Sequence, residues 1–191
     1  MSSRTGPRAT GTDGSDFSHR QRVSQSIKLS VQYKWNLKML FGLHSLVLLA
    51  MWTKVGSEFA IRELGFKSKF FEKLDLPTAY PWEYVWCSSV VCIILGLLSF
   101  RHNKGNLLRI EYYSQFFLGI LPCSVGLGSL LPELIDYIFN MESSRTPTFN
   151  GHFPMVIIWY IFFLIAFQIH IFAIYFTYHL LGSWERDVKK D

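Results

Sequence analysis

The segment Met155–Tyr178 places the strongest constraint on what this chain can fold into. It runs for 24 residues without a single Asp, Glu, Lys or Arg. At about 1.5 Å per residue, a helix of this length measures about 36 Å, which is enough to cross a hydrocarbon core of about 30 Å with some tilt. The core of a soluble domain needs no apolar helix of that length. The segment therefore predicts a transmembrane helix.

Three further apolar runs predict three further spans. The shortest charge-free run is Met39–Thr53, but Lys38 and Lys54 at its ends can extend their side chains to the headgroups and lengthen it. A buried helix of a soluble domain is the alternative, and the other apolar runs argue against it. We predict an all-α, four-span transmembrane bundle with spans at about 37–55, 84–100, 112–131 and 155–178.

The region before the first span is polar at first and then alternating. Residues 1–26 are rich in Ser, Gly, Thr and Arg, so they have little apolar surface to bury, and we predict a disordered tail. Residues 27–36 alternate apolar and polar, which is typical of a strand. No partner strand is evident, so we favour a helix that lies at the membrane interface and continues into the first span.

Three segments connect the predicted spans, and a polar tail follows them. Residues 56–81 form the longest predicted loop, in which apolar residues at helical spacing favour a short amphipathic helix on the membrane surface. Those residues are Phe59, Phe66, Phe70 and Leu74. A polar turn at about 101–111 and an acidic loop at 132–153 are the other connections, and residues 182–191 are the C-terminal tail.

Small residues indicate where helices pack. Ser88, Cys92 and Gly96 recur every four residues in the second span. Such a stripe lets another helix approach closely, so we predict a packing face, either internal or between copies of the chain in a homo-oligomer. The third span is rich in small residues and contains Pro122, whose missing N–H predicts a kink. These small residues could line a pore, but close helix packing explains them without one.

The distribution of Lys and Arg predicts the orientation. With four spans, the N-terminal tail, the middle turn and the C-terminal tail share one side and carry thirteen of these bases, against six in the other two loops. By the positive-inside rule, both termini are predicted to lie in the cytosol. Since the bases lie outside the apolar runs, the net charge of +5 suits lipid headgroups, and no nucleic-acid partner is predicted.

The spans contain few groups with catalytic or metal-binding potential. His44 and His170 lie inside spans, where an ionisable side chain is a functional candidate. Metal sites need clustered ligands, and His170 is nine residues from His179, so we favour hydrogen bonds between helices over catalysis. Gln168 is only two residues from His170 and points away from it. Glu83 is interpreted as an interface charge. No catalytic, cofactor or metal site is predicted.

Residues Gly11–Val23, with the sequence GTDGSDFSHRQRV, resemble the N-terminal signature of the Jagunal family. Further similarity lies in Trp82-Glu83-Tyr84, Gln168-x-His170 and Leu181-x-Ser183-Trp184. The resemblance implies residence in the endoplasmic reticulum, organisation of that membrane network, and vesicle-mediated traffic in the early secretory pathway. It also implies association with coat proteins and no enzymatic activity.

The two tails are the predicted sites for cytosolic trafficking or coat proteins. In the N-terminal signature, both signs of charge suit an electrostatically steered protein contact better than plain attraction to lipid. The residues predicted to bind a partner are Asp13, Asp16, Phe17, His19, Arg20 and Arg22. Lys189 and Lys190 form a candidate retrieval signal. It departs from the dilysine pattern because Val188, and not lysine, stands fourth from the end.

A small transporter or channel subunit is the alternative function, with the third span and His170 as its pathway. Ion transport usually leaves Asp, Glu, Lys or Arg within the spans. Apart from Lys38 and Lys54 near the two ends of the first span, the four predicted spans hold no such residue. We therefore favour a structural and adaptor protein that also contacts the lipid bilayer.

Overall fold

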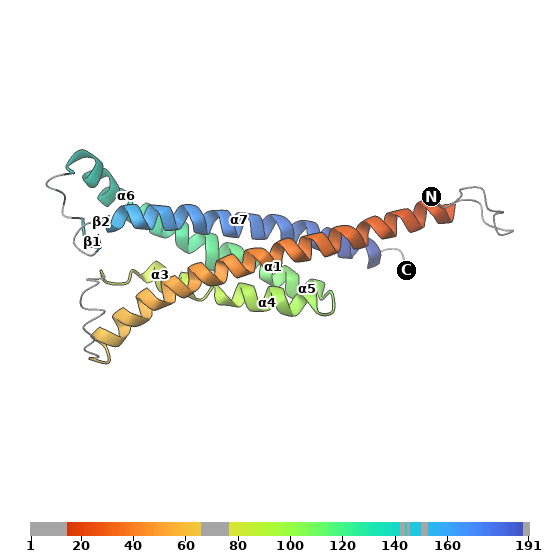
Figure 1. The fold of residues 1–191 in the computed structure, drawn as a ribbon, viewed down its shortest axis with the longest axis horizontal. Coiled ribbons are helices and arrows are strands. Elements are labelled where there is room, and N and C mark those ends of the chain that lie inside the picture. Colours follow the sequence, from red (N-terminus) through yellow and green to blue (C-terminus); the bar gives the residue numbers. More distant parts are fainter. Residues whose placement is uncertain (1–14, 66–76, 142–143, 145, 150–152, 189–191) are drawn as a thin grey trace.

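The computed structural model describes residues 15–65, 77–141, 144, 146–149 and 153–188. Its elements form an elongated helical bundle in which α1 and α7 lie side by side (Figure 1). In chain order the elements are α1 (Ser15–Arg62), α3 (Pro81–Cys87), α4 (Val90–Phe100), α5 (Gly105–Ser114), the π-helix η1 (Gln115–Ile120), α6 (Leu121–Phe139), β1 (Thr148–Phe149), β2 (Phe153–Pro154) and α7 (Met155–Val188). The two short strands pair antiparallel.

Four helical stretches are long and apolar enough to cross a membrane, which confirms the all-α, four-span fold. They are Val23–Arg62, Pro81–Phe100, Gly105–Phe139 and Met155–Trp184. Both ends of the described chain lie at the same end of the bundle, beside the turn between α4 and α5 (Figure 1). We call this the terminal end, and the opposite end, which carries β1 and β2, the loop end.

Helix α1 extends further than predicted in both directions. Its backbone is helical from Ser15, within the predicted tail, and it continues to Arg62, inside the predicted loop. The helix contains no proline, and each residue added to an established helix costs little, so nothing in this stretch ends it. Residues 27–36 are helical as predicted, and of the four residues of the amphipathic pattern only Phe59 lies among the described residues.

The two remaining connections are shorter than predicted. The turn covers only Arg101–Lys104, because α5 begins at Gly105. Asn103 adopts a left-handed φ of 51°, and the Lys104 N–H donates to the Ser99 carbonyl at 2.9 Å, a bond that closes the end of α4 within a few residues. The acidic loop also shrinks, because α6 continues to Phe139 with Pro132 inside it. A proline removes a single hydrogen bond, which a membrane helix can tolerate.

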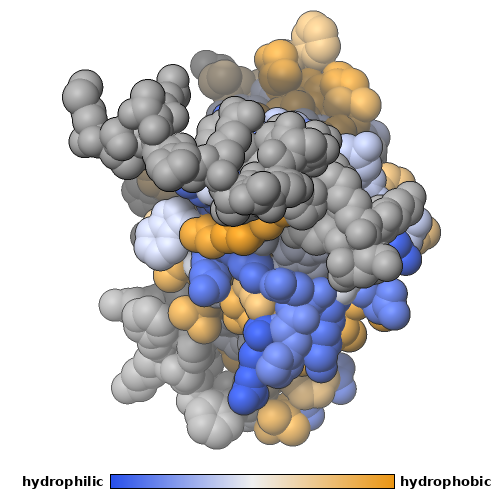
Figure 2. Space-filling model, turned by 90° about the vertical axis from the view of Figure 1, so that its right-hand side faces the viewer, coloured by the Kyte–Doolittle hydropathy of each residue, from blue (hydrophilic) through white to orange (hydrophobic). Residues whose placement is uncertain are grey.

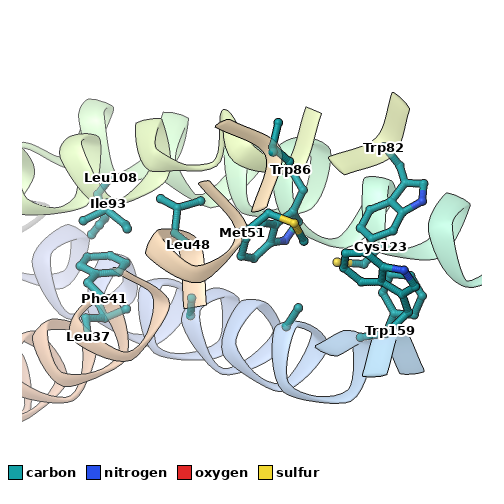
Figure 3. Close-up of a cluster of buried hydrophobic side chains, with 14 of the residues drawn as sticks. Leu37, Phe41, Leu48, Met51, Trp82, Trp86, Ile93, Leu108, Cys123 and Trp159 are labelled. Carbon is teal, nitrogen blue, oxygen red and sulfur yellow. The ribbon is translucent and has the colours of Figure 1, made fainter. Parts of the chain in front are cut away.

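A cluster of buried hydrophobic side chains holds the bundle together along its length (Figure 3). Near the terminal end, Leu37 and Phe41 of α1 face Ile93 and Leu108. Tryptophans fill the loop end, where the Trp82 and Trp159 rings meet edge to face at 5.2 Å. Because surrounding lipid is as apolar as this cluster, close packing rather than exclusion of water holds the four spans together.

Candidate functional site

Two buried histidines meet in the middle of the bundle. His44 of α1 and His170 of α7 are fully buried, and their rings lie edge to face with centroids 4.8 Å apart. The neighbouring spans are irregular beside them. Between α3 and α4, the Ser89 N–H donates to the Trp86 carbonyl three residues back, and η1 is π-helical. Irregular turns of this kind occur often at functional sites, so we take this region as the candidate site.

The hydrogen bonds of His170 fix which ring nitrogen carries the proton. The Trp86 indole Nε1–H can only donate, and it lies 3.1 Å from His170 Nε2, so Nε2 is the acceptor. The Nδ1–H of a neutral imidazole then donates to Gln115 Oε1 at 2.6 Å. His170 therefore connects the second span to the third.

The same direction of donation continues to a buried carboxylate. Gln115 Nε2 donates to Glu111 Oε1 at 2.7 Å, and Thr177 Oγ1 donates to Glu111 Oε2 at 2.9 Å. Glu111 is fully buried, and its carboxylate accepts one bond at each oxygen. We call this set the polar chain: Trp86, His170, Gln115, Glu111 and Thr177. It ties the second, third and fourth spans together.

A glycine makes room for the polar chain. A Cβ on Gly119 would overlap the ring of His170, so the imidazole occupies space that any side chain would fill. His44 joins the site from the first span through Nε2, which lies 2.9 Å from Ser89 Oγ. Its Nδ1 is buried and has no hydrogen-bond partner among the described residues. All four spans thus contribute a polar side chain to one place.

The structure confirms hydrogen bonding between helices for both histidines, while Gln168 is exposed on the outer side of α7. The expectation of charge-free spans was wrong. The third span begins before the predicted residue 112, and it includes the buried Glu111. The one sequence signal for this carboxylate is its spacing of four from Gln115, which puts both on one helix face.

The interpretation of Glu83 as a charge exposed at the membrane interface was wrong. It is fully buried and forms an ion pair with Lys54, with Nζ–Oε distances of 2.6 and 2.8 Å. Its Oε1 also accepts the Tyr80 N–H at 3.2 Å, at the start of α3. Lys54 Nζ lies 5.0 Å from the centre of the Trp159 ring. The ion pair joins α1 to α3 at the loop end, and the contact of Lys54 with Trp159 adds α7.

A second lysine–tryptophan pair lies at the terminal end. Lys34 Nζ is 5.3 Å from the centre of the Trp184 ring and donates to Asn103 Oδ1 at 2.6 Å. The Trp184 indole N–H donates to Ser30 Oγ at 2.9 Å. The predicted motif Leu181-x-Ser183-Trp184 is therefore docked on α1 and is not part of a free tail.

The other predicted site residues fall in different surroundings. Cys92 and Gly96 are buried and Ser88 is exposed, and a Cβ on Gly96 would overlap the ring of Phe41. Whether the stripe also joins copies of the chain stays a prediction. In the N-terminal signature, Asp16, Phe17, His19, Arg20 and Arg22 lie in the first turns of α1. Asp13, Lys189 and Lys190 lie outside the described residues.

Within the described part of the chain, no group of three or more His, Cys, Asp or Glu side chains could hold a metal ion. The three cysteines, Cys87, Cys92 and Cys123, are free thiols. Apart from His44 Nδ1, the side chains of the site form hydrogen bonds with one another, and most of these bonds join different helices.

Comparison with known proteins places the chain in a family. A family model described as "Jagunal, ER re-organisation during oogenesis" matches residues 1–188. The chain belongs to the Jagunal family. This confirms the resemblance seen in the N-terminal signature, and the description connects the Jagunal family with re-organisation of the endoplasmic reticulum.

Named Jagunal relatives match over nearly their full length. The chain is 56% identical to the Protein jagunal homolog of Caenorhabditis elegans over 191 residues, 100% of both chains. It is 33% identical to Protein jagunal homolog 1 of Homo sapiens over 184 residues, 96% of this chain and 94% of the human protein. Protein jagunal of Drosophila melanogaster is 32% identical over 189 residues, with 97% and 95% covered.

Proposed function

We propose that this chain is a non-enzymatic membrane protein of the endoplasmic reticulum. In this role it supports the organisation of the reticulum and vesicle-mediated transport in the early secretory pathway. Its four spans anchor it, and its tails bind trafficking or coat proteins in the cytosol. Membership of a family described by re-organisation of the reticulum is the observation that carries this proposal.

The arrangement of the terminal end supports an adaptor role. Helix α1 starts within the N-terminal signature, and α7 runs to Val188, close to the C-terminus. Ser26 Oγ donates to the Ser183 carbonyl at 3.3 Å, so the two helices pack against each other at this end. A partner could thus contact both tails at once. The thirteen-to-six distribution of Lys and Arg supports a cytosolic position for this platform.

Glu111 reopens the question of transport, but the extent of the polar chain argues against it. On α7, the chain reaches from His170 to Thr177, seven residues or about 10 Å along the axis. This is about a third of the hydrocarbon core. A transport pathway has to reach both membrane surfaces. The polar chain instead lies between apolar layers on α7, with Leu180 buried beyond Thr177 toward the terminal end and Phe163 buried beyond His170 toward the loop end.

The charge pattern of the N-terminal signature provides the test. In cells that lack the endogenous protein, we expect the variant Asp13→Lys, Asp16→Lys to insert and to reach the reticulum, because insertion depends on the spans. We expect it not to restore network morphology or secretory traffic. The measurements are reticulum morphology by microscopy and the rate at which a secreted reporter leaves the cell.

A charge-matched control separates recognition from net charge. The substitutions Ser2→Lys, Ser3→Lys, Thr5→Lys and Thr10→Lys add the same four positive charges and leave Gly11–Val23 intact, so this variant should restore function. If the variant Asp13→Lys, Asp16→Lys restored function fully, this would contradict the proposal that a partner binds the N-terminal signature. Failure of the unaltered chain to rescue any secretory or morphological defect would contradict the proposed function itself.

A further inference from the structure

The two ends of the bundle differ in how their basic side chains are neutralised. At the loop end, Lys54 pairs with Glu83, and Arg62 lies 3.2 Å from Glu58. At the terminal end, α1 contributes Lys34 and Lys38, and the turn before α5 contributes Arg101 and Lys104. The sequence contains no Asp or Glu from 21 to 57 or from 101 to 110. Among the described side chains, these four bases have no carboxylate partner within ion-pair distance.

A direct contact joins Lys34 to the turn that carries Arg101 and Lys104. Lys34 Nζ donates to Asn103 Oδ1 at 2.6 Å and to the Phe100 carbonyl at 3.5 Å, which joins α1 to the turn. Lys38 follows Lys34 by one helical turn on the same side of α1. Arg101 and Lys104 flank Asn103, and both are exposed, as is Lys38. The result is a basic cluster built from two elements.

Figure 2 views the molecule from the terminal end. Hydrophilic side chains gather below the grey atoms, on the side where the turn between α4 and α5 lies in Figure 1. Hydrophobic side chains border this hydrophilic area. On α1, Trp35 and Met39 directly follow Lys34 and Lys38, and both are exposed, so the basic cluster lies beside surface that suits lipid chains.

The two lysine–tryptophan pairs give the depth of the cluster in the membrane. Lys34 and Lys54 are twenty residues apart on one helix, or about 30 Å, which matches the thickness of a hydrocarbon core. Each lies over a tryptophan of α7, a residue type enriched at the level of the headgroups. Lys34 and the turn that it binds through Asn103 therefore lie at the level of the headgroups. The exposed Lys38 starts one helical turn deeper, and its long side chain can extend to the same level.

We propose that Lys34, Lys38, Arg101 and Lys104 bind the headgroup of an anionic phospholipid that carries a phosphomonoester, as phosphoinositides do. A phosphodiester brings a single negative charge and would leave most of the cluster unneutralised. A phosphomonoester adds about 1.5 to 2 negative charges and three acceptor oxygens. Basic pockets between spans are known to suit such headgroups. This binding site goes beyond the proposed function and does not depend on it.

Binding can be measured on the full chain in non-ionic detergent, with dioctanoyl phosphatidylinositol 4-phosphate as the probe and the thermal midpoint as the readout. We expect the probe to raise the midpoint in a saturable way. The variant Lys38→Gln, Arg101→Gln, Lys104→Gln changes three exposed side chains and leaves Lys34 in place. Because each base near the headgroups contributes to the attraction, its affinity should fall at least about tenfold.

The control variant is Lys67→Gln, Lys69→Gln, Lys73→Gln, which removes the same charge from the segment that joins α1 to α3. It should bind the probe as the unaltered chain does. Equal loss in both variants, or no loss in the first, would overturn the proposal. So would an equal response to dioctanoyl phosphatidylcholine, which lacks net charge, or a response to inorganic phosphate at the same concentration, which would indicate a site for free anions.

Discussion

At the scale of single residues, the polar chain depends on the fit of the His170 ring into the space beside Gly119, which has no side chain. His170 takes its orientation from two hydrogen bonds, and Gly119 leaves the space that the ring fills. A glycine inside a helix costs about 0.5–1 kcal/mol relative to alanine. The site therefore retains a residue that weakens its own helix, which is expected where close approach matters more than helix propensity.

Gly119→Ala should lower the stability of the bundle by about 1–3 kcal/mol, the range measured for overpacked sites and for buried polar groups that lose a partner. The added methyl group would displace the imidazole and break its bond to Gln115. The matched control is Gly128→Ala, because a Cβ at Gly128 meets nothing within 4 Å. The measurement is the thermal midpoint in detergent. A midpoint for Gly119→Ala equal to or above that of the control would contradict the fit described here.

The carboxylates show what the sequence could not reveal at this scale. Glu83 and Glu111 each lie near the predicted end of a span, where a charge normally reaches the headgroups. In the structure, both are fully buried, and Lys54, Gln115 and Thr177 donate hydrogen bonds to them. Two of these three partners are distant in the sequence, so only the packing of the helices determines the surroundings of the two carboxylates.

At the scale of elements, the second span shows how a stripe of small residues is divided. A regular spacing of four would place Ser88, Cys92 and Gly96 on one face. The tight turns between α3 and α4 rotate the chain, so that Ser89 points inward in place of Ser88. Gly96 keeps its inward position and receives the ring of Phe41.

Gly96→Leu should therefore disrupt the bundle, because a branched side chain would force α1 away from α4. We expect a loss of about 1–3 kcal/mol, visible as a lower thermal midpoint in detergent. Ser88→Leu adds a side chain of the same size on the exposed face and should leave the midpoint nearly unchanged. If Ser88→Leu instead alters the oligomeric state in size-exclusion chromatography, the stripe serves contacts between copies.

The bounds of the elements differ from the sequence prediction in one consistent way. Hydropathy located all four helices but placed most of their ends too early or too late, since it reports where lipid surrounds a helix and not where the helix stops. Helix α1 continues into polar sequence at both ends because it contains no proline. The short turn at Asn103 depends on a left-handed φ and on the bond to Lys34, which hydropathy does not register.

At the scale of the whole molecule, both ends of the described chain and the turn between α4 and α5 lie at the same end of the bundle (Figure 1). The basic cluster comes from α1 and this turn. By the positive-inside rule, we expect this end to face the cytosol. Protease added to sealed microsomes should remove a tag placed at either terminus. A tag in the segment between α1 and α3 should survive until detergent opens the membrane. Protection of either terminal tag would contradict this orientation.

The two lysine–tryptophan pairs also predict the bilayer in which the molecule is most stable. The distance of about 30 Å between Lys34 and Lys54 matches an average hydrocarbon core, between a reticulum core of about 27 Å and a plasma-membrane core of about 32–33 Å. Lys54 is held by its ion pair with Glu83, and Lys34 by Asn103, so neither charge can move far along the membrane normal.

In a bilayer that is too thick, the charges of both lysines would be drawn into hydrocarbon. We therefore expect the thermal midpoint in nanodiscs of phosphatidylcholine to be highest at a core thickness of about 30 Å. It should decline in lipids with longer chains, because each further ångström of mismatch costs a fraction of a kcal/mol. A midpoint that is constant across the series, or that rises with chain length, would show that these pairs do not set the position of the bundle in the membrane.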